Sequence, residues 1–207
     1  MTTSKRKAEV VLFDLGNVVV ELGAGPLPAH WLSAGQSFDL KQWFHSDVAL
    51  AFERGELSAL ELAEYLQRDL NLDVSPELVV AEFRKWPLRI YPQLPALLIK
   101  LRQCYQLAVL SNTNELHYPR LFNEFDLDKY FDKELVFASH LIRLAKPDPE
   151  AFIYVLDQLQ AEPEQVLFLD DMKENVATAR SLGMKAQQLK GGEEVAAYLN
   201  SLISNQD

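Results

Sequence analysis

Polar side chains suited to chemistry stand directly after three apolar runs of this chain, and a lysine joins them further along. Parallel strands bring their carboxyl ends to one edge of a sheet, so side chains that follow such strands converge on one crevice. Carboxylates there would hold a hard cation such as Mg²⁺, which takes oxygen ligands and often shares them with a substrate phosphate. The set comprises Asp14, Ser111, Asn112, Lys146, Asp170 and Asp171.

These residue types suit the transfer of a phosphoryl group. Lys146 and the donors around Ser111 would neutralise phosphate oxygens, and a carboxylate relieved of like-charge repulsion by a cation could attack phosphorus as a nucleophile. Each motif alone has a structural explanation, because turns and helix starts favour Asp, Asn, Ser and Pro. A preference for turns does not explain why four such motifs follow one another along the chain, each after a predicted strand or at the start of a predicted helix.

Apolar runs alternate with amphipathic segments along most of the chain. The runs are too short for helices and predict buried strands, whereas the longer periodic segments predict helices. We expect strands at 10–13, 107–110, 135–137, 166–169 and, more weakly, 186–189, and helices at 94–102, 116–125, 149–159, 174–182 and 193–202. This alternation predicts a three-layer, doubly wound (Rossmann-like) α/β fold with a mostly parallel sheet.

The pattern of residues changes after the first predicted strand. Glycines and prolines break the chain, and signals of helix ends follow. Ser58 and Glu61 form a capping box, Ser75 before Pro76 opens a further helix, and Gly55 ends an earlier one. We therefore predict an α-helical cap of residues 21–87 inserted into a core domain of residues 1–20 and 88–207.

Composition and charge narrow the class of protein. The 207 residues carry a formal net charge of −10, which argues against nucleic acid and anionic membrane as partners. The chain shows neither an apolar run of about 18–20 residues that could span a membrane nor an apolar signal core in residues 1–8. We expect a cytoplasmic protein, a monomer or weak homo-oligomer, that acts on a small molecule. Cys104 lies in an apolar-rich stretch and is expected in the core.

Together, the four motifs resemble the haloacid dehalogenase-like superfamily of hydrolases, along nearly the whole chain. The likeness is carried by Phe13-Asp14-Leu15-Gly16-Asn17-Val18, Leu110-Ser111-Asn112-Thr113, Lys146-Pro147 and Phe168-Leu169-Asp170-Asp171. The helical insert is similar to the small α-helical cap of that family. Leu15-Gly16-Asn17 and Ser111-Asn112-Thr113-Asn114 look closest to bacterial phosphatases that act on sugar phosphates such as α-D-glucose 1-phosphate.

The resemblance implies a Mg²⁺-dependent phosphomonoester hydrolase, acting on a small sugar phosphate or similar metabolite through an aspartyl-phosphate. Asp14 would be both the nucleophile and a ligand of Mg²⁺. The backbone carbonyl of Gly16 and the carboxylate of Asp171 would complete the protein's share of the metal site. Asp170 would bind the metal directly or through water.

The resemblance also implies which residues bind the phosphoryl group. Ser111 and the amide of Asn112 would bind it, and Lys146 would bridge that group and Asp14. A lysine in this position serves charge neutralisation, so we expect Lys146→Ala to lower turnover while leaving the folded state intact.

One departure from the family pattern concerns the general acid. The common first motif carries a second aspartate two positions after the nucleophile, where this chain has Gly16. Loss of a general acid costs on the order of 10²–10⁴ in rate unless another group replaces it. His117 is the nearest downstream substitute, and His30 and His45 lie in the insert. Anomeric or aryl phosphates would tolerate the loss best, which favours sugar 1-phosphates; a left-handed backbone at Gly16 would exclude a restored aspartate.

Two other functions stay open. A metal-independent 2-haloacid dehalogenase would use Asp14 against carbon, but the pair Asp170 and Asp171 argues against it, since such charges are costly without a cation. A weakly active or inactive binding module is supported only by Gly16. Aromatic side chains of the insert, including Trp43, Phe44 and Phe52, are expected to pack its own core rather than line a lid.

Overall fold

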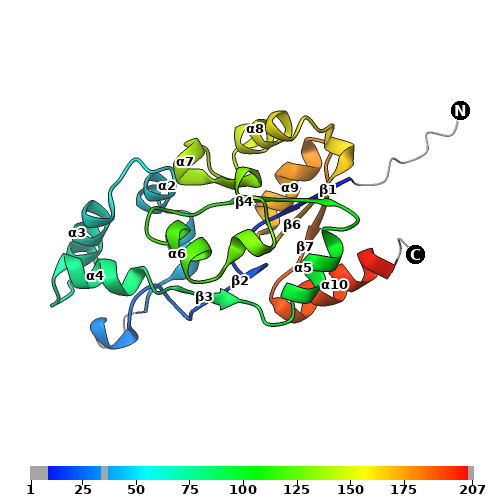
Figure 1. The fold of residues 1–207 in the computed structure, drawn as a ribbon. Coiled ribbons are helices and arrows are strands. Elements are labelled where there is room, and N and C mark those ends of the chain that lie inside the picture. The colour runs from blue at the N-terminus through cyan, green and yellow to red at the C-terminus, as the bar shows by residue number, and fades with distance from the viewer. Residues whose placement is uncertain (1–8, 34–36, 205–207) are drawn as a thin grey trace, which may run out of the picture.

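A five-stranded parallel sheet forms the centre of the computed structural model, which describes residues 9–33 and 37–204 (Figure 1). The strands run in the order β5-β4-β1-β6-β7. Their bounds are β1 Val10–Phe13, β4 Gln106–Ser111, β5 Val136–Ala138, β6 Val166–Asp170 and β7 Lys185–Gln188. Residues 1–8, where the sequence shows no apolar signal core, lie outside the described residues.

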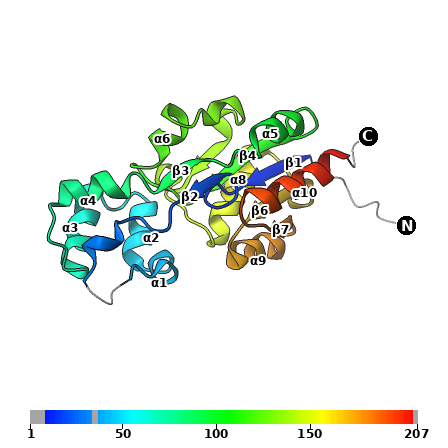
Figure 2. The ribbon, with the colours of Figure 1, turned by 90° about the horizontal axis from the view of Figure 1, so that it is seen from below.

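Helices cover both faces of this sheet, so the predicted three-layer fold is confirmed (Figure 2). One face carries α5 (Pro95–Leu101), α6 (Tyr118–Asn123) and α10 (Gly192–Ser204), and the other carries α8 (Pro149–Leu159) and α9 (Lys173–Ser181). Val11 and Phe13 of β1 belong to the first core, while Val10 and Leu12 belong to the second. This alternation is the period of a strand that is buried on both sides.

A helical lobe stands beside the sheet, at the left of Figure 1. It contains α1 (Leu40–Phe44), α2 (Asp47–Glu53), α3 (Ala59–Asp69) and α4 (Pro76–Phe83). The predicted capping box is present, since Ser58 N–H donates to Glu61 Oε2 over 2.8 Å and Glu61 N–H to Ser58 Oγ over 3.3 Å. The lobe has an apolar core of its own, which includes Trp43 and Phe52 as expected.

A two-stranded antiparallel ribbon joins the lobe to the sheet domain, and the sequence analysis did not predict it. β2 (Val20–Leu22) pairs with β3 (Pro87–Ile90). The helix that opens after Ser75 ends at Phe83, three residues before Trp86, whose place before Pro87 favours extended backbone. Two short strands carry little periodicity, so they are hard to recognise without their partner.

Two further expectations differ from the structure. Cys104 is exposed, because α5 ends at Leu101 and Cys104 lies in the exposed turn that follows. The short helix α7 (Ser139–Ile142) follows β5, where no helix was predicted. Across the described parts of the chain, no helix combines the length and apolar character needed to cross a membrane.

His117 ties the sheet domain to the lobe. Its Nε2 lies 2.8 Å from the carbonyl oxygen of Phe83, and its Nδ1 lies 3.1 Å from Nδ2 of Asn114. The neutral ring satisfies both contacts when Nε2 donates and Nδ1 accepts. The imidazole also stacks on the Phe83 ring, with centroids 5.2 Å apart. Burial lowers the pKa of His117 to about 4, so the neutral ring is the form that the fold requires.

We therefore expect part of the acid sensitivity of the fold to come from His117. The unfolded chain binds a proton with a pKa near 6.5, well above the folded value. The contribution of the neutral ring is thus complete above pH 6.5 and is lost as pH falls toward 4, at up to about 1.4 kcal/mol per pH unit. Urea unfolding at pH 7.5 and 5.5 should show a smaller loss for His117→Gln than for wild type. His30→Gln, at an exposed position, should keep the wild-type slope; equal slopes in all three proteins would contradict the assignment.

Candidate active site

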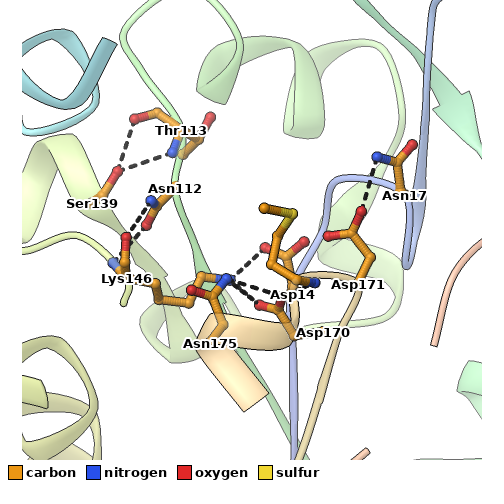
Figure 3. Close-up of polar contacts among 10 residues, drawn as sticks. Asp14, Asn17, Asn112, Thr113, Ser139, Lys146, Asp170, Asp171 and Asn175 are labelled. Atoms are coloured by element: carbon orange, nitrogen blue, oxygen red, sulfur yellow. Dashed lines mark hydrogen bonds and ion pairs between the residues drawn. The ribbon is translucent and has the colours of Figure 1, made fainter. Parts of the chain in front are cut away.

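The residues predicted from the sequence meet where β1, β4 and β6 end (Figure 3). Asp14 directly follows β1, Ser111 ends β4 and Asp170 ends β6. β1 lies between the other two strands, so their carboxyl ends form one continuous edge. Ligand sites of open parallel sheets lie outside this edge.

Lys146 is the centre of the site. Its Nζ lies 2.7 Å from Asp14 Oδ1 and 2.6 Å from Asp170 Oδ2, and the residue is only 2% exposed. Burial opposes the charge of Lys146, but attraction from the two carboxylates outweighs it and raises the pKa of the ammonium. The lysine therefore stays charged and balances two buried acids.

Asp14 experiences the strongest competition between burial and charge. Burial raises the pKa of Asp14 to about 7, although the positive charge of Lys146 opposes the rise. The neighbouring carboxylates Asp170 and Asp171 raise it further. Negative charge is thus in excess around Asp14, and a cation in the pocket would relieve that excess.

The two adjacent aspartates at the end of β6 differ in what they face. Asp170 is fully buried; its oxygens accept hydrogen bonds from Lys146, the Met172 N–H at 2.7 Å and Asn175 Nδ2 at 3.0 Å. Asp171 instead lines the pocket beside Asp14 and accepts a hydrogen bond from Asn17 Nδ2 at 3.1 Å. Burial and the charge of Asp170 raise the pKa of Asp171, while the bond from Asn17 lowers it.

The turn after Asp14 places its left-handed residue at Asn17, with φ of 57°. Asparagine tolerates this conformation better than most residues, and its N–H bonds to Val20 O at 2.8 Å. Gly16 is not left-handed, so the possible obstacle to a side chain there is absent. A Cβ at Gly16 would meet only the flexible end of Leu22 at 3.3 Å and Asp14 Oδ2 at 3.9 Å among the nearer atoms.

Asn112 braces the lysine loop. Its Nδ2 donates to Lys146 O and its Oδ1 accepts from Lys146 N–H, each at 2.9 Å. Ser139 supports the loop after β4 through two bonds to the backbone of Thr113, at 2.9 and 3.0 Å. No motif in the sequence marked Ser139 or Asn175 as site residues. Only the spacing of Asn175 after Asp170, in the first turn of the next helix, could have indicated it.

Two adjoining pockets open at this edge of the sheet. The catalytic pocket, of about 720 Å³ with its mouth, is lined by Asp14, Gly16, Lys146 and Asp171 among others. The apolar pocket, of about 580 Å³ with its mouth, is reached by Ser111 and lined by aromatic residues of the lobe and of the chain that returns from it. These are Trp43, Phe44, Phe52, Phe83 and Trp86. Trp43 and Phe52 therefore serve the lobe core and the pocket at once.

Comparison with known proteins assigns the class. The family model of haloacid dehalogenase-like hydrolases matches residues 8–183, which cover the sheet and the motifs described above. The chain belongs to this family and is a hydrolase.

Relatives and solved structures extend the comparison. The chain is 26% identical to D-ribitol-5-phosphate phosphatase of Bacteroides thetaiotaomicron, covering 92% of this chain and 98% of that protein. It is 30% identical to a sesquiterpene phosphatase of Aspergillus oryzae, covering 94% and 96%. It is 27% identical to a drimenol cyclase of Aspergillus calidoustus, of which it spans only 36%.

A solved structure of a Bacteroides thetaiotaomicron family member, in complex with magnesium and inorganic phosphate, superposes with a TM-score of 0.74 at 26% identity, covering 89% of this chain and 96% of that one. An L-2-haloacid dehalogenase of Xanthobacter autotrophicus, at 18% identity and a TM-score of 0.64, covering 88% and 77%, shares the fold.

The residues present fit a magnesium ion that shares its coordination with a phosphate. Within residues 9–33 and 37–204, no three His, Cys, Asp or Glu side chains form a metal cage. Mg²⁺ in phosphate-handling sites commonly takes one or two carboxylates and fills its octahedron with water and substrate oxygens. Asp14, Asp171 and Gly16 line one pocket. The neighbouring carboxylates of Asp170 and Asp171 raise the pKa of Asp14, so a cation would be favourable there.

The buried position of Lys146 between Asp14 and Asp170 argues against the expectation that its removal leaves the fold intact. An apolar residue there would leave Asp14 and Asp170 buried without a counter-charge, which costs roughly 3–5 kcal/mol. We expect Lys146→Met to lower the free energy of unfolding by about this amount in urea titrations. The double variant Lys146→Met with Asp170→Asn should recover part of the loss.

Lys100→Met, at an exposed position of α5, is the control and should change the free energy of unfolding by less than about 0.5 kcal/mol. A Lys146→Met protein as stable as wild type would show that the two carboxylates are neutral in the folded protein without the lysine.

Proposed function

We propose that this hydrolase is a Mg²⁺-dependent phosphomonoesterase that forms an aspartyl-phosphate on Asp14. The observation that carries the proposal is the buried Asp14, held by Lys146 on one oxygen and lining a pocket with Asp171. Relatives along nearly the whole chain are named as phosphatases, and the solved structure with magnesium and phosphate supports the same chemistry.

The residues divide the reaction between them. Asp14 Oδ1 accepts from Lys146, which leaves Oδ2 to attack phosphorus. The ammonium of Lys146 offsets the repulsion between the carboxylate and the anionic phosphoryl group. Asp170 holds that ammonium, and Asn112 holds the backbone of Lys146. Ser111 and the amide of Asn112 would donate to the transferring oxygens. Mg²⁺, when bound by Asp14, Asp171 and the Gly16 carbonyl, supplies positive charge for the transferring group.

We further propose that residues 21–87 act as a cap over a core domain of residues 1–20 and 88–207. The lobe has its own apolar core and joins the rest of the chain at the β2–β3 ribbon. Its aromatic side chains line the pocket beside the phosphate site. This arrangement would exclude water from the reacting group and select the organic part of the substrate.

The substrate class proposed is a small organic phosphate, with a sugar phosphate as first candidate. Aromatic rings bind the C–H faces of a sugar ring as well as hydrocarbon, and the apolar pocket lies beside the phosphate site. The strongly apolar lining also favours a second candidate, the monophosphate of an apolar alcohol. The two relatives named as phosphatases represent one substrate of each kind, D-ribitol 5-phosphate and a sesquiterpene.

The decisive experiment measures phosphate release from α-D-glucose 1-phosphate, D-ribitol 5-phosphate and a prenyl monophosphate, with and without Mg²⁺. We expect Mg²⁺-dependent release, and a loss of at least about 10³-fold in Asp14→Asn because the nucleophile is removed. A halide-release assay on a 2-haloacid runs beside it. Halide release without phosphate release would show a dehalogenase, and neither product would show a binding module.

Binding of Mg²⁺ to the folded chain should raise the midpoint of thermal unfolding. A ligand at 100 times its dissociation constant adds about 2.7 kcal/mol to the stability of a single-site protein. We expect Asp171→Asn to lose most of this shift in scanning fluorimetry, whereas Asp128→Asn, at an exposed position, should keep it. An identical shift in Asp171→Asn and wild type would place the metal elsewhere.

A further inference from the structure

One acidic side chain of the lobe stands at the boundary between the two pockets. Five of the described residues line both: Gly16, Leu22, Phe44, Glu53 and Asn112. Among these five, Glu53 alone carries an ionisable side chain. It is the last residue of α2, and no motif in the sequence marks it.

The boundary is where the bond to be broken must lie. Asp14 and Lys146 place the phosphoryl group in the catalytic pocket, and the apolar pocket is left for the organic part. The oxygen that joins them then sits between the pockets, beside Glu53. Gly16, where the family's usual acid is missing, faces the same boundary.

The surroundings of Glu53 favour its protonated form. Burial raises the pKa of Glu53 to about 7, although a hydrogen bond from Asn112 and the charge of Lys146 oppose the rise. The residue is partly buried and lines both pockets. Its place at the end of a helix also disfavours a negative charge, because the helix dipole is negative there.

The chain after Glu53 is fastened to the sheet domain, which fixes the end of the helix that carries Glu53. Arg143 Nη1 donates to the carbonyl oxygens of Arg54, at 3.0 Å, and of Gly55. Gly55 is left-handed, with φ of 67°, and a Cβ there would come within 2.9 Å of the carbonyl oxygen of His140. This close approach requires glycine and seats the end of α2 on α7.

Other candidate acids fit less well. Both ring nitrogens of His117 are used in bonds to Asn114 and Phe83. His45 and Glu174 line the catalytic pocket but not the apolar one. His30 lines neither of the two.

We propose that Glu53 is the general acid and base of the proposed phosphatase reaction, in place of the residue missing at position 16. As Asp14 bonds to phosphorus, the bond from phosphorus to the leaving oxygen breaks. That oxygen keeps the electron pair and takes the proton of the Glu53 carboxyl group. The resulting carboxylate then removes a proton from water as the water attacks the aspartyl-phosphate. Breaking the bond from phosphorus to Asp14 releases inorganic phosphate. It restores the carboxylate of Asp14 and leaves Glu53 protonated again.

The inference rests on the proposed function and is tested by leaving-group dependence. Glu53→Gln should lower kcat/KM for an alkyl phosphate by about 10²–10³-fold. For p-nitrophenyl phosphate the loss should stay below about tenfold, because that leaving group departs without a proton. A burst of p-nitrophenol in the variant would show the slowed second step. Glu56→Gln, in the exposed turn after α2, should match wild type on both substrates.

A second variant separates chemistry from structure. Gly16→Asp added to Glu53→Gln should restore much of the alkyl phosphate activity, since the backbone and space at Gly16 admit a side chain. Equal losses on both substrates, or no loss, would overturn the role of Glu53. A wild-type protein without activity on any phosphate would instead overturn the proposed function, and this inference with it. The Mg²⁺-dependent thermal shift confirms that each variant is folded.

Discussion

The buried contact between Lys146, Asp14 and Asp170 is the interaction on which the site depends. Three carboxylates gather at the edge of a parallel sheet, where desolvation makes each negative charge costly. One ammonium at 2.7 and 2.6 Å from two of them makes the arrangement tolerable. The lysine stands between two strand ends, and the loop that carries it is braced by two hydrogen bonds with Asn112, one donated and one accepted. Stability and reactivity therefore share the same atoms.

The contact between lobe and sheet domain is the second constraint. In the proposed reaction, the sheet edge would supply the nucleophile and the phosphate-binding groups, while the lobe would supply the aromatic wall and Glu53. Polar side chains of the sheet domain hold the two together, among them Arg120, which donates to the carbonyl oxygens of Arg84 and Pro87 at 2.7 and 2.8 Å. Chemistry that needs both an acid and a dry pocket would thus depend on this closed arrangement.

Much of the site was predictable because its residues follow strands. Asp14, Ser111 and Asp170 stand at ends of apolar runs, and the rule for parallel sheets brings such ends together. Supporting residues were not predictable: Ser139 follows a three-residue strand, and Glu53 closes an ordinary amphipathic helix. Their roles come from contacts with residues far away in the chain, which no local pattern records. The β2–β3 ribbon was not predictable for the same reason.

The sequence by itself determined the class of fold, the order of the motifs and the chemical inventory of the sheet edge, because strand and helix periods and polar strand ends are local properties. Tertiary structure alone decided how these groups are used. It turned Asp170 inward and Asp171 toward the pocket, placed the left-handed backbone at Asn17 instead of Gly16, and engaged both nitrogens of His117. It also brought Glu53 to the same two pockets that Gly16 lines. Distances, burial and charge arise only when distant segments pack, so they follow from the fold and not from any one stretch of chain.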